Sequence, residues 1–146
     1  MKSEEVKNMG KTIFAAGLLL LAGVAHAQQL RKGNLVGVHH MSVKLEPGVT
    51  MEQFVDFYNK KAIPEYEKAW LGWKAYPVKR VRGEKADGMG VIIVIPSERE
   101  RDKYYNADGT ESELGKAANA KVQPIFDEMR KLGTITEDPY IDWVVY

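Results

Sequence analysis

The chain contains no cysteine among its 146 residues. Disulfides, thiol nucleophiles, iron–sulfur clusters and cysteine-ligated zinc are therefore excluded, as is a lipid attached through cysteine. Histidine is scarce too, because the chain has three and only His39 and His40 follow residue 27. Imidazole chemistry in the folded domain must use one of these two residues. Stability must come from a hydrophobic core and from association with other chains.

Common catalytic sequence patterns are also missing. The chain has no phosphate-binding loop, no Gly-x-Gly-x-x-Gly fingerprint, no Gly-x-Ser-x-Gly elbow and no His-Glu-x-x-His motif. The Asp-Gly turns at 87–88 and 108–109 lack the ligand spacing of a calcium loop. These absences argue against the usual nucleotide-binding, serine-hydrolase, zinc-protease and EF-hand classes.

The longest apolar run lies near the start of the chain. Three lysines precede the uncharged segment 12–25, and Ala25-His26-Ala27 follows as a small-x-small cleavage signal. This pattern is typical of a secretory signal peptide over residues 1–27, so the protein is expected to be exported, to the periplasm or the extracellular space. A membrane anchor is the alternative, but a run of about 14 residues is shorter than the roughly 20 that span a bilayer. Met9 is an alternative start, since it leads directly into the run.

The remaining 119 residues carry no net charge. Residues 1–27 hold three of the 21 lysines and arginines and two of the 20 aspartates and glutamates, which leaves 18 of each sign. A neutral chain lacks the excess of positive charge that binds polyanions, so neither nucleic acid nor an anionic membrane is an expected partner. The length corresponds to one domain. We expect a flexible tail over 28–34 and a single domain over 35–146, with no membrane anchor in the mature chain.

Hydrophobic periodicity and capping signals give the order of the elements. Strands are predicted over 35–45, 73–85, 91–95 and 140–146, and helices over 50–70, 98–105 and 110–132. Capping boxes mark the helix starts, at Thr50 with Gln53, Ser97 with Glu100 and Thr110 with Glu113. Pro64 is expected to break or kink the first helix near Ile63. Ala86-Asp87-Gly88 is predicted to be a hairpin turn.

This β-α-β-β-α-β order predicts a ferredoxin-like α+β domain, with an antiparallel four-stranded sheet and helices on one face. The topology places the apolar strands 35–45 and 91–95 in the middle and the charged strand 73–85 at an edge. The other face would carry Val36, Val38 and aromatic side chains, and such a patch is normally covered. A second copy is the simplest symmetric cover, which predicts a homodimer.

The segment 43–73, with Pro47-Gly48, Phe54 and Gly72-Trp73, resembles the strand, turn and helix of the dimeric α+β barrel superfamily. That superfamily includes antibiotic-biosynthesis monooxygenases, EthD-like and NIPSNAP-like proteins, and these residues identify no single family among them. The resemblance covers most of 35–146 as a pattern of elements. It implies a dimeric barrel with a pocket between each sheet and its own helices or within the barrel. Some members oxidise aromatic polyketides without a cofactor, and some act on haem.

Two adjacent histidines are the first candidates for chemistry. Neighbouring strand residues point to opposite faces, so His39 and His40 cannot hold one metal ion together, and no metal site is expected. His39 shares with Met41 the face predicted to meet the helices, and His40 shares the other face with Ser42. We therefore choose His40 as the candidate base or axial ligand, because imidazole titrates near neutrality. The alternative is that both rings are hydrogen-bonded structural residues.

Other side chains could line a ligand pocket. The aromatic set is large for this chain and comprises Tyr58, Tyr66, Trp70, Trp73, Tyr76, Trp143 and Tyr146. These rings suit a flat ligand, and an ordinary core with a dimer interface is the alternative. The cations at 79–82, Arg80 among them, could bind a carboxylate or form a solvated sheet edge. Asp142 could orient a histidine across the sheet.

The sequence as a whole predicts an exported homodimer that binds an apolar or aromatic small molecule. The expected ligand-binding residues are His39, Ser42, Tyr76, Arg80 and Trp143. One alternative is a monooxygenase-like or haem-active enzyme that uses His40, and the other is a structural module without a pocket. No cofactor is expected, and haem enters only with the enzyme alternative.

Overall fold

The computed structural model describes residues 29–83, 88–139 and 141–146. The leader predicted at 1–27, its alternative start, and Ala86 and Asp87 of the predicted turn lie outside the described residues. The strands in the described part are β1 (Leu35–Leu45), β2 (Lys74–Lys79), β3 (Met89–Ile95), β4 (Gly133–Glu137) and β5 (Ile141–Val144). The helices there are α1 (Met51–Phe57), the π-helical turn η1 (Tyr58–Ala62), α2 (Ile63–Ala69), α3 (Glu98–Arg101) and α4 (Glu113–Arg130).

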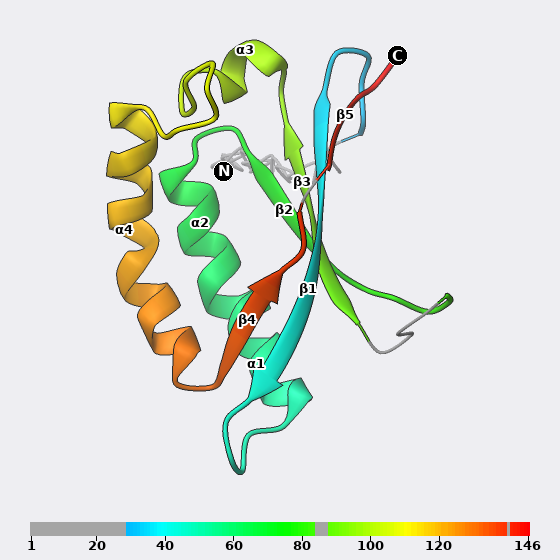
Figure 1. Ribbon diagram of the computed structural model, residues 1–146, viewed down its shortest axis with the longest axis vertical. Coiled ribbons are helices and arrows are strands. Elements are labelled where there is room, and N and C mark those ends of the chain that lie inside the picture. The colour runs from blue at the N-terminus through cyan, green and yellow to red at the C-terminus, as the bar shows by residue number, and fades with distance from the viewer. Residues whose placement is uncertain (1–28, 84–87, 140) are drawn as a thin grey trace, which may run out of the picture.

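An antiparallel sheet with the strand order β2-β3-β1-β4 forms one layer, and α1, α2 and α4 cover one of its faces (Figure 1). This is the order of a ferredoxin-like fold, so the predicted α+β class is confirmed. The apolar strands β1 and β3 lie in the middle of the sheet, as expected. The charged strand β2 lies at the edge, where Pro77 is tolerated.

The edge beside β1 consists of two short strands where the sequence predicts one. β4 pairs with residues 41–45 in the second half of β1, and β5 pairs with residues 35–38 in its first half (Figure 1). β4 was not predicted, because Ile135 is its one large apolar residue and its sequence lacks a clear alternation. β5 corresponds to the strand predicted at 140–146. Together these strands bring Glu137 and Asp142 beside β1.

The first helical segment begins as its sequence predicts. The Thr50 side chain accepts a hydrogen bond from the Gln53 N–H (3.2 Å), and the Gln53 side chain accepts one from the Thr50 N–H (2.8 Å). The capping box is thus confirmed. In place of the break or kink expected near Ile63, the chain forms a π-helical turn in which the Ile63 N–H donates to the Tyr58 carbonyl. This wider turn accommodates Pro64, which has no N–H to donate, and helical structure continues through α2.

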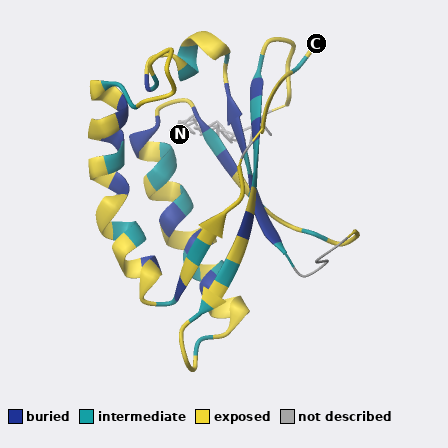
Figure 2. Ribbon diagram, viewed as in Figure 1, coloured by how far each residue is buried: buried dark blue, intermediate teal, exposed yellow. Residues whose placement is uncertain are grey.

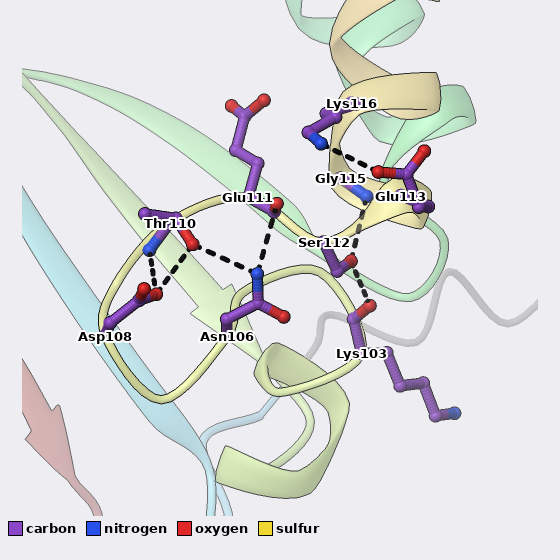
Figure 3. Close-up of polar contacts among 9 residues, drawn as sticks. All are labelled: Lys103, Asn106, Asp108, Thr110, Glu111, Ser112, Glu113, Gly115 and Lys116. Atoms are coloured by element: carbon purple, nitrogen blue, oxygen red, sulfur yellow. Dashed lines mark hydrogen bonds and ion pairs between the residues drawn. The ribbon is translucent and has the colours of Figure 1, made fainter.

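The start of α4 differs from the prediction. Ser112 is the N-cap, because its side chain accepts from the Gly115 N–H (3.2 Å) while its hydroxyl donates to the Lys103 carbonyl (Figure 3). Thr110, the predicted cap, is held by Asp108, whose carboxylate accepts from the Thr110 N–H and hydroxyl (3.0 and 2.6 Å). The capping box predicted at Thr110 is therefore wrong, and the helix cap lies two residues later. The Thr110 side chain is instead hydrogen-bonded to Asp108 within the loop.

The core lies between the sheet and the helices (Figure 2). Its largest fully buried side chains are Leu35, Phe54, Trp70 and Val122. Odd-numbered residues of β1 face the helices and even-numbered ones face away, which confirms the predicted division of this strand into two faces. No helix in the described part of the chain is long and apolar enough to cross a membrane.

The opposite face of the sheet, here called the open face, carries apolar side chains. Among the described residues, no helix covers this face (Figure 1). By strand register its apolar side chains are Val36, Val38, Tyr76, Val78, Ile92, Val94, Ile141 and Trp143. Tyr76 is 41 % exposed and Trp143 57 % exposed. The open face is thus an apolar surface that spans β2, β3, β1 and β5.

Candidate functional site

A cavity of about 1140 Å³ lies between the helix-side face of the sheet and the helices. Its wall draws on β1, β3, η1, α2 and α4 and on the loop over 105–109. Asn106, Ala107 and Gly109 of this loop line the cavity and are exposed, so the cavity reaches the surface there. The loop is held in shape by hydrogen bonds from the Asn106 side chain to Thr110 and to the Glu111 carbonyl (Figure 3).

One wall of the cavity is aromatic. Trp70 stacks on Tyr66 and on Tyr105, with ring centroids 5.7 Å apart in both pairs and interplanar angles of 20° and 22°. Trp73 adds a ring 4.8 Å from that of Trp70. The indole N–H groups of both tryptophans are buried and have no hydrogen-bond partner among the described residues. Such a wall offers flat apolar contact area.

Two tyrosines of the cavity wall, Tyr58 and Tyr66, keep their protons. Burial raises the pKa of Tyr58 to about 12, and the nearby Glu137 carboxylate adds to this shift. Burial also raises the pKa of Tyr66 far above its ordinary value. Both hydroxyls therefore remain neutral near pH 7, and each can donate or accept a hydrogen bond at the cavity wall.

His39 and Glu137 are two polar residues of the cavity wall that lie close together. His39 Nδ1 lies 3.6 Å from Glu137 Oε2. The polar interaction with the His39 imidazole lowers the pKa of Glu137 below its ordinary value, although partial burial of the carboxylate opposes the shift. Because the pKa is lower in the folded chain than in the unfolded one, the contact stabilises the fold at neutral pH. That contribution is lost as the pH falls through the lowered pKa.

A second carboxylate approaches the same histidine from β5. Asp142 is paired with Gly37 in the register of β5 and β1, and both residues line the cavity. Asp142 Oδ2 lies 3.9 Å from Arg101 Nη1. Arg101 also donates to Asp102 through Nε and Nη2, and this hydrogen bonding raises the pKa of the guanidinium. Arg101 is therefore engaged by two carboxylates at the mouth of the cavity.

The residues predicted as ligand-binding divide between two faces of the sheet. His39 lines the cavity. His40, Ser42, Tyr76 and Trp143 lie on the open face, so the structure separates them from His39. The two sets lie on opposite sides of one strand, as the alternation of β1 requires.

Arg80 lies just beyond β2, at the sheet edge, and is not part of the cavity wall. Of the predicted aromatic set, Tyr58, Tyr66, Trp70 and Trp73 line the cavity. Tyr146, at the C-terminus, is fully exposed. The ligand-binding roles assigned to Arg80 and to the residues of the open face stay predictions.

Sequence reasoning missed Glu137 and the wall residues Gly37, Arg101 and Tyr105. Glu137 lies in the unpredicted strand β4, and only the pairing of β4 with β1 brings it to His39. Asp142 was identified as able to reach a histidine across the sheet, and the structure places it beside the His39 ring. Alternation along β1 does show that residue 37 shares a face with His39.

In the part of the chain that the structure describes, no three histidine, aspartate or glutamate side chains are grouped so that they could hold a metal ion. The charged groups at the cavity are instead paired in ion pairs. Protein-only chemistry at this site would have to use His39, the carboxylates near it and the tyrosine hydroxyls.

Comparison with known proteins identifies no family. No family model and no curated protein matches the chain. Among solved structures, the chain is similar to a point mutant of SnoaB, a cofactor-independent oxygenase from Streptomyces nogalater. The identity is 12 %, the TM-score is 0.44, and the match covers 77 % of this chain and 93 % of SnoaB. So low an identity and TM-score carry no information about activity.

Proposed function

We propose that this protein binds an apolar, aromatic small molecule in the cavity between its sheet and its helices. The observation that carries the proposal is the cavity itself, with a volume of about 1140 Å³ and a wall of stacked aromatic rings. Ligand pockets are typically roughly 300–1,000 Å³, mostly apolar, with a few polar groups that orient the ligand. This cavity combines an aromatic and aliphatic wall with polar side chains that could orient a ligand, among them His39, Glu137 and Asp142.

A purely structural domain would not need such a space. Protein interiors are normally packed as densely as organic crystals, with few voids larger than a water molecule. The cavity lies beside Trp70 and Trp73, which are 2 % and 4 % exposed, so it adjoins the core of the domain. A ligand that fills it would restore the packing that the helices and the sheet leave incomplete.

Ligand binding can be tested through the tryptophans of the aromatic wall. In a Trp143→Phe background the remaining tryptophans are Trp70 and Trp73. Titration with 2-methoxynaphthalene should change their fluorescence with a saturable curve. Ala62→Leu places a larger side chain in the wall and should weaken binding by about tenfold or more, because it removes space that the ligand needs.

Ala117→Leu is the matched control, because Ala117 is exposed on α4 and is not part of the wall. This variant should bind the probe like the parent protein. Circular dichroism checks that both variants fold. A parent protein that shows no saturable change with the probe, or an Ala62→Leu variant that binds as well as Ala117→Leu, would contradict the proposal.

Proton transfer to His39 is a second candidate function, favoured by the contact between His39 and Glu137. A carboxylate beside Nδ1 favours the imidazole tautomer that carries its proton on Nδ1, which leaves Nε2 as the basic nitrogen. A base of this kind could take a proton from an acidic C–H or O–H group of the bound molecule. In this interpretation His39 takes the role that the sequence assigns to His40.

A further inference from the structure

Gly37 opens a small space in the cavity wall between two polar atoms. A Cβ atom on residue 37 would lie 3.0 Å from Asp142 Oδ1 and 3.2 Å from His39 Nε2. Both distances are shorter than ordinary van der Waals contacts, so any larger residue would push against these two side chains. Gly37 does not have a positive φ, so its backbone does not itself require glycine. We call this space the Gly37 notch.

The two atoms beside the Gly37 notch are hydrogen-bond acceptors when the imidazole is neutral. Asp142 turns Oδ2 toward Arg101 and Oδ1 toward the notch. His39 turns Nδ1 toward Glu137 and Nε2 toward the notch. A neutral imidazole that donates from Nδ1 accepts at Nε2. The notch therefore favours a group that brings hydrogens.

The charges on the cavity wall reinforce this preference. The carboxylates are Asp102, Glu137 and Asp142, and the cations are Arg101 and Arg130. Arg101 is engaged with Asp102 and Asp142, and Arg130 with Asp127. The phenols that line the cavity are Tyr58, Tyr66 and Tyr105. An anionic ligand group at the notch would face the Asp142 carboxylate, whereas a hydroxyl or an ammonium would face two acceptor atoms.

We propose that the Gly37 notch binds a hydrogen-bond donor group, a hydroxyl or an ammonium, carried by the ligand of the cavity. This inference rests on the proposed ligand binding and specifies which end of the ligand meets His39 and Asp142. An aromatic skeleton would lie against Trp70 and Tyr66, and its donor group would enter the notch. A carboxylate in the same position is disfavoured.

Four naphthalene probes with one skeleton test the proposal on the purified protein. They are 2-methoxynaphthalene, 2-naphthol, 2-(aminomethyl)naphthalene and 2-naphthoate, with affinities measured by isothermal titration calorimetry. At least one donor probe should bind about tenfold or more tightly than the ether, because hydrogen bonds to charged groups are the stronger ones. The naphthoate should bind more weakly than the ether. Whichever of the two donor probes binds more tightly shows whether the notch prefers a hydroxyl or an ammonium.

Two variants connect the preference to the notch. Gly37→Ala should reduce the ratio of donor to ether affinity toward one, since its Cβ occupies the space. Asp142→Asn keeps the side-chain shape but replaces an acceptor oxygen with a donor amide, so the ammonium probe should lose most of its advantage. Asp138→Asn, an exposed neighbour outside the cavity wall, is the control and should retain the parent ratio.

The possible results separate this inference from the proposed function. If none of the four probes binds, ligand binding and the donor subsite both fail. If the ether binds but neither donor probe binds more tightly, the donor subsite alone is overturned. The donor subsite is also overturned if Asp142→Asn keeps the same ratio of donor to ether affinity as Asp138→Asn. This comparison remains decisive even if Gly37→Ala does not fold.

Discussion

His39 and His40 are consecutive residues with different surroundings. The His39 ring lies on the helix side of the sheet, beside Glu137, and lines the cavity. The His40 side chain is exposed on the open face, and residue 40 pairs with Gly90 of β3. Because successive side chains of a strand point to opposite faces, the two rings cannot serve the same site. Each is the natural control for the other.

His39→Asn and His40→Asn should differ in their effect on proton transfer. The probe is 2-indanone, an aromatic ketone with acidic C–H groups, and exchange of these hydrogens in D₂O is followed by proton NMR. The C–H bond breaks as an N–H bond forms at His39 Nε2, and the electron pair passes into the enolate. If His39 is the base, the parent protein accelerates this exchange, and His39→Asn should lower the accelerated rate by about 100-fold, a loss typical of a general base.

The other histidine variant and Glu137→Gln complete this experiment. With His40→Asn, 2-indanone should exchange at the parent rate. With Glu137→Gln the exchange rate should lie between those of the two histidine variants, because Gln can still contact the ring but carries no charge. Loss of exchange in His40→Asn with retention in His39→Asn would support the original sequence assignment. Equal rates in both histidine variants would reject proton transfer at either ring.

At the scale of elements, the start of α1 has a measurable contribution. Thr50→Ala removes the hydroxyl that accepts from the Gln53 N–H and should lower the free energy of unfolding by about 1 kcal/mol. Thr50→Ser keeps the acceptor and should stay close to the parent. Urea unfolding followed by circular dichroism measures both. A Thr50→Ala variant as stable as Thr50→Ser would show that the capping box contributes nothing to stability.

Elements whose signals are local were predictable from the sequence. β1 was predicted at its observed bounds, 35–45, and the N-cap at Thr50 is where the sequence places it. β4 and the cap at Ser112 were not predictable, because both depend on partners distant in the chain or on competing loop contacts. The π-helical turn also escapes sequence reasoning, since Pro64 indicates an interruption but not its form.

At the scale of the whole molecule, the order of elements was enough to predict the ferredoxin-like topology. The resemblance implies a pocket between the sheet and its helices or within a barrel, but the volume and the lining of the cavity do not follow from the order of elements, because they depend on how far the helices stand from the sheet. An apolar strand face looks the same in sequence whether it packs against a helix or lines a pocket. For this reason the sequence assigns His39 to the packed face and favours His40, the next residue, as the base.

The open face makes a homodimer the remaining prediction at this scale. Trp143 and Tyr76 are exposed there on two different strands, with Val36 and Val38 of β1 between them in the sheet. Apolar patches of this kind are usually covered. A two-fold axis would bring the same face of a second copy onto it, so that each Trp143 packs on the partner sheet. The bound ligand would remain on the other side of each sheet.

Trp143→Ser should therefore weaken self-association, whereas Leu71→Ser should not. Leu71 is 70 % exposed but lies after α2, away from the open face, so the pair compares loss of one exposed apolar side chain at two positions. A central interface tryptophan contributes about 2 kcal/mol or more, or roughly 30-fold in the dimer dissociation constant. Size-exclusion chromatography with light scattering over a range of concentrations measures that constant. A parent protein that stays monomeric at high concentration, or equal weakening by both substitutions, would reject the open face as the dimer interface.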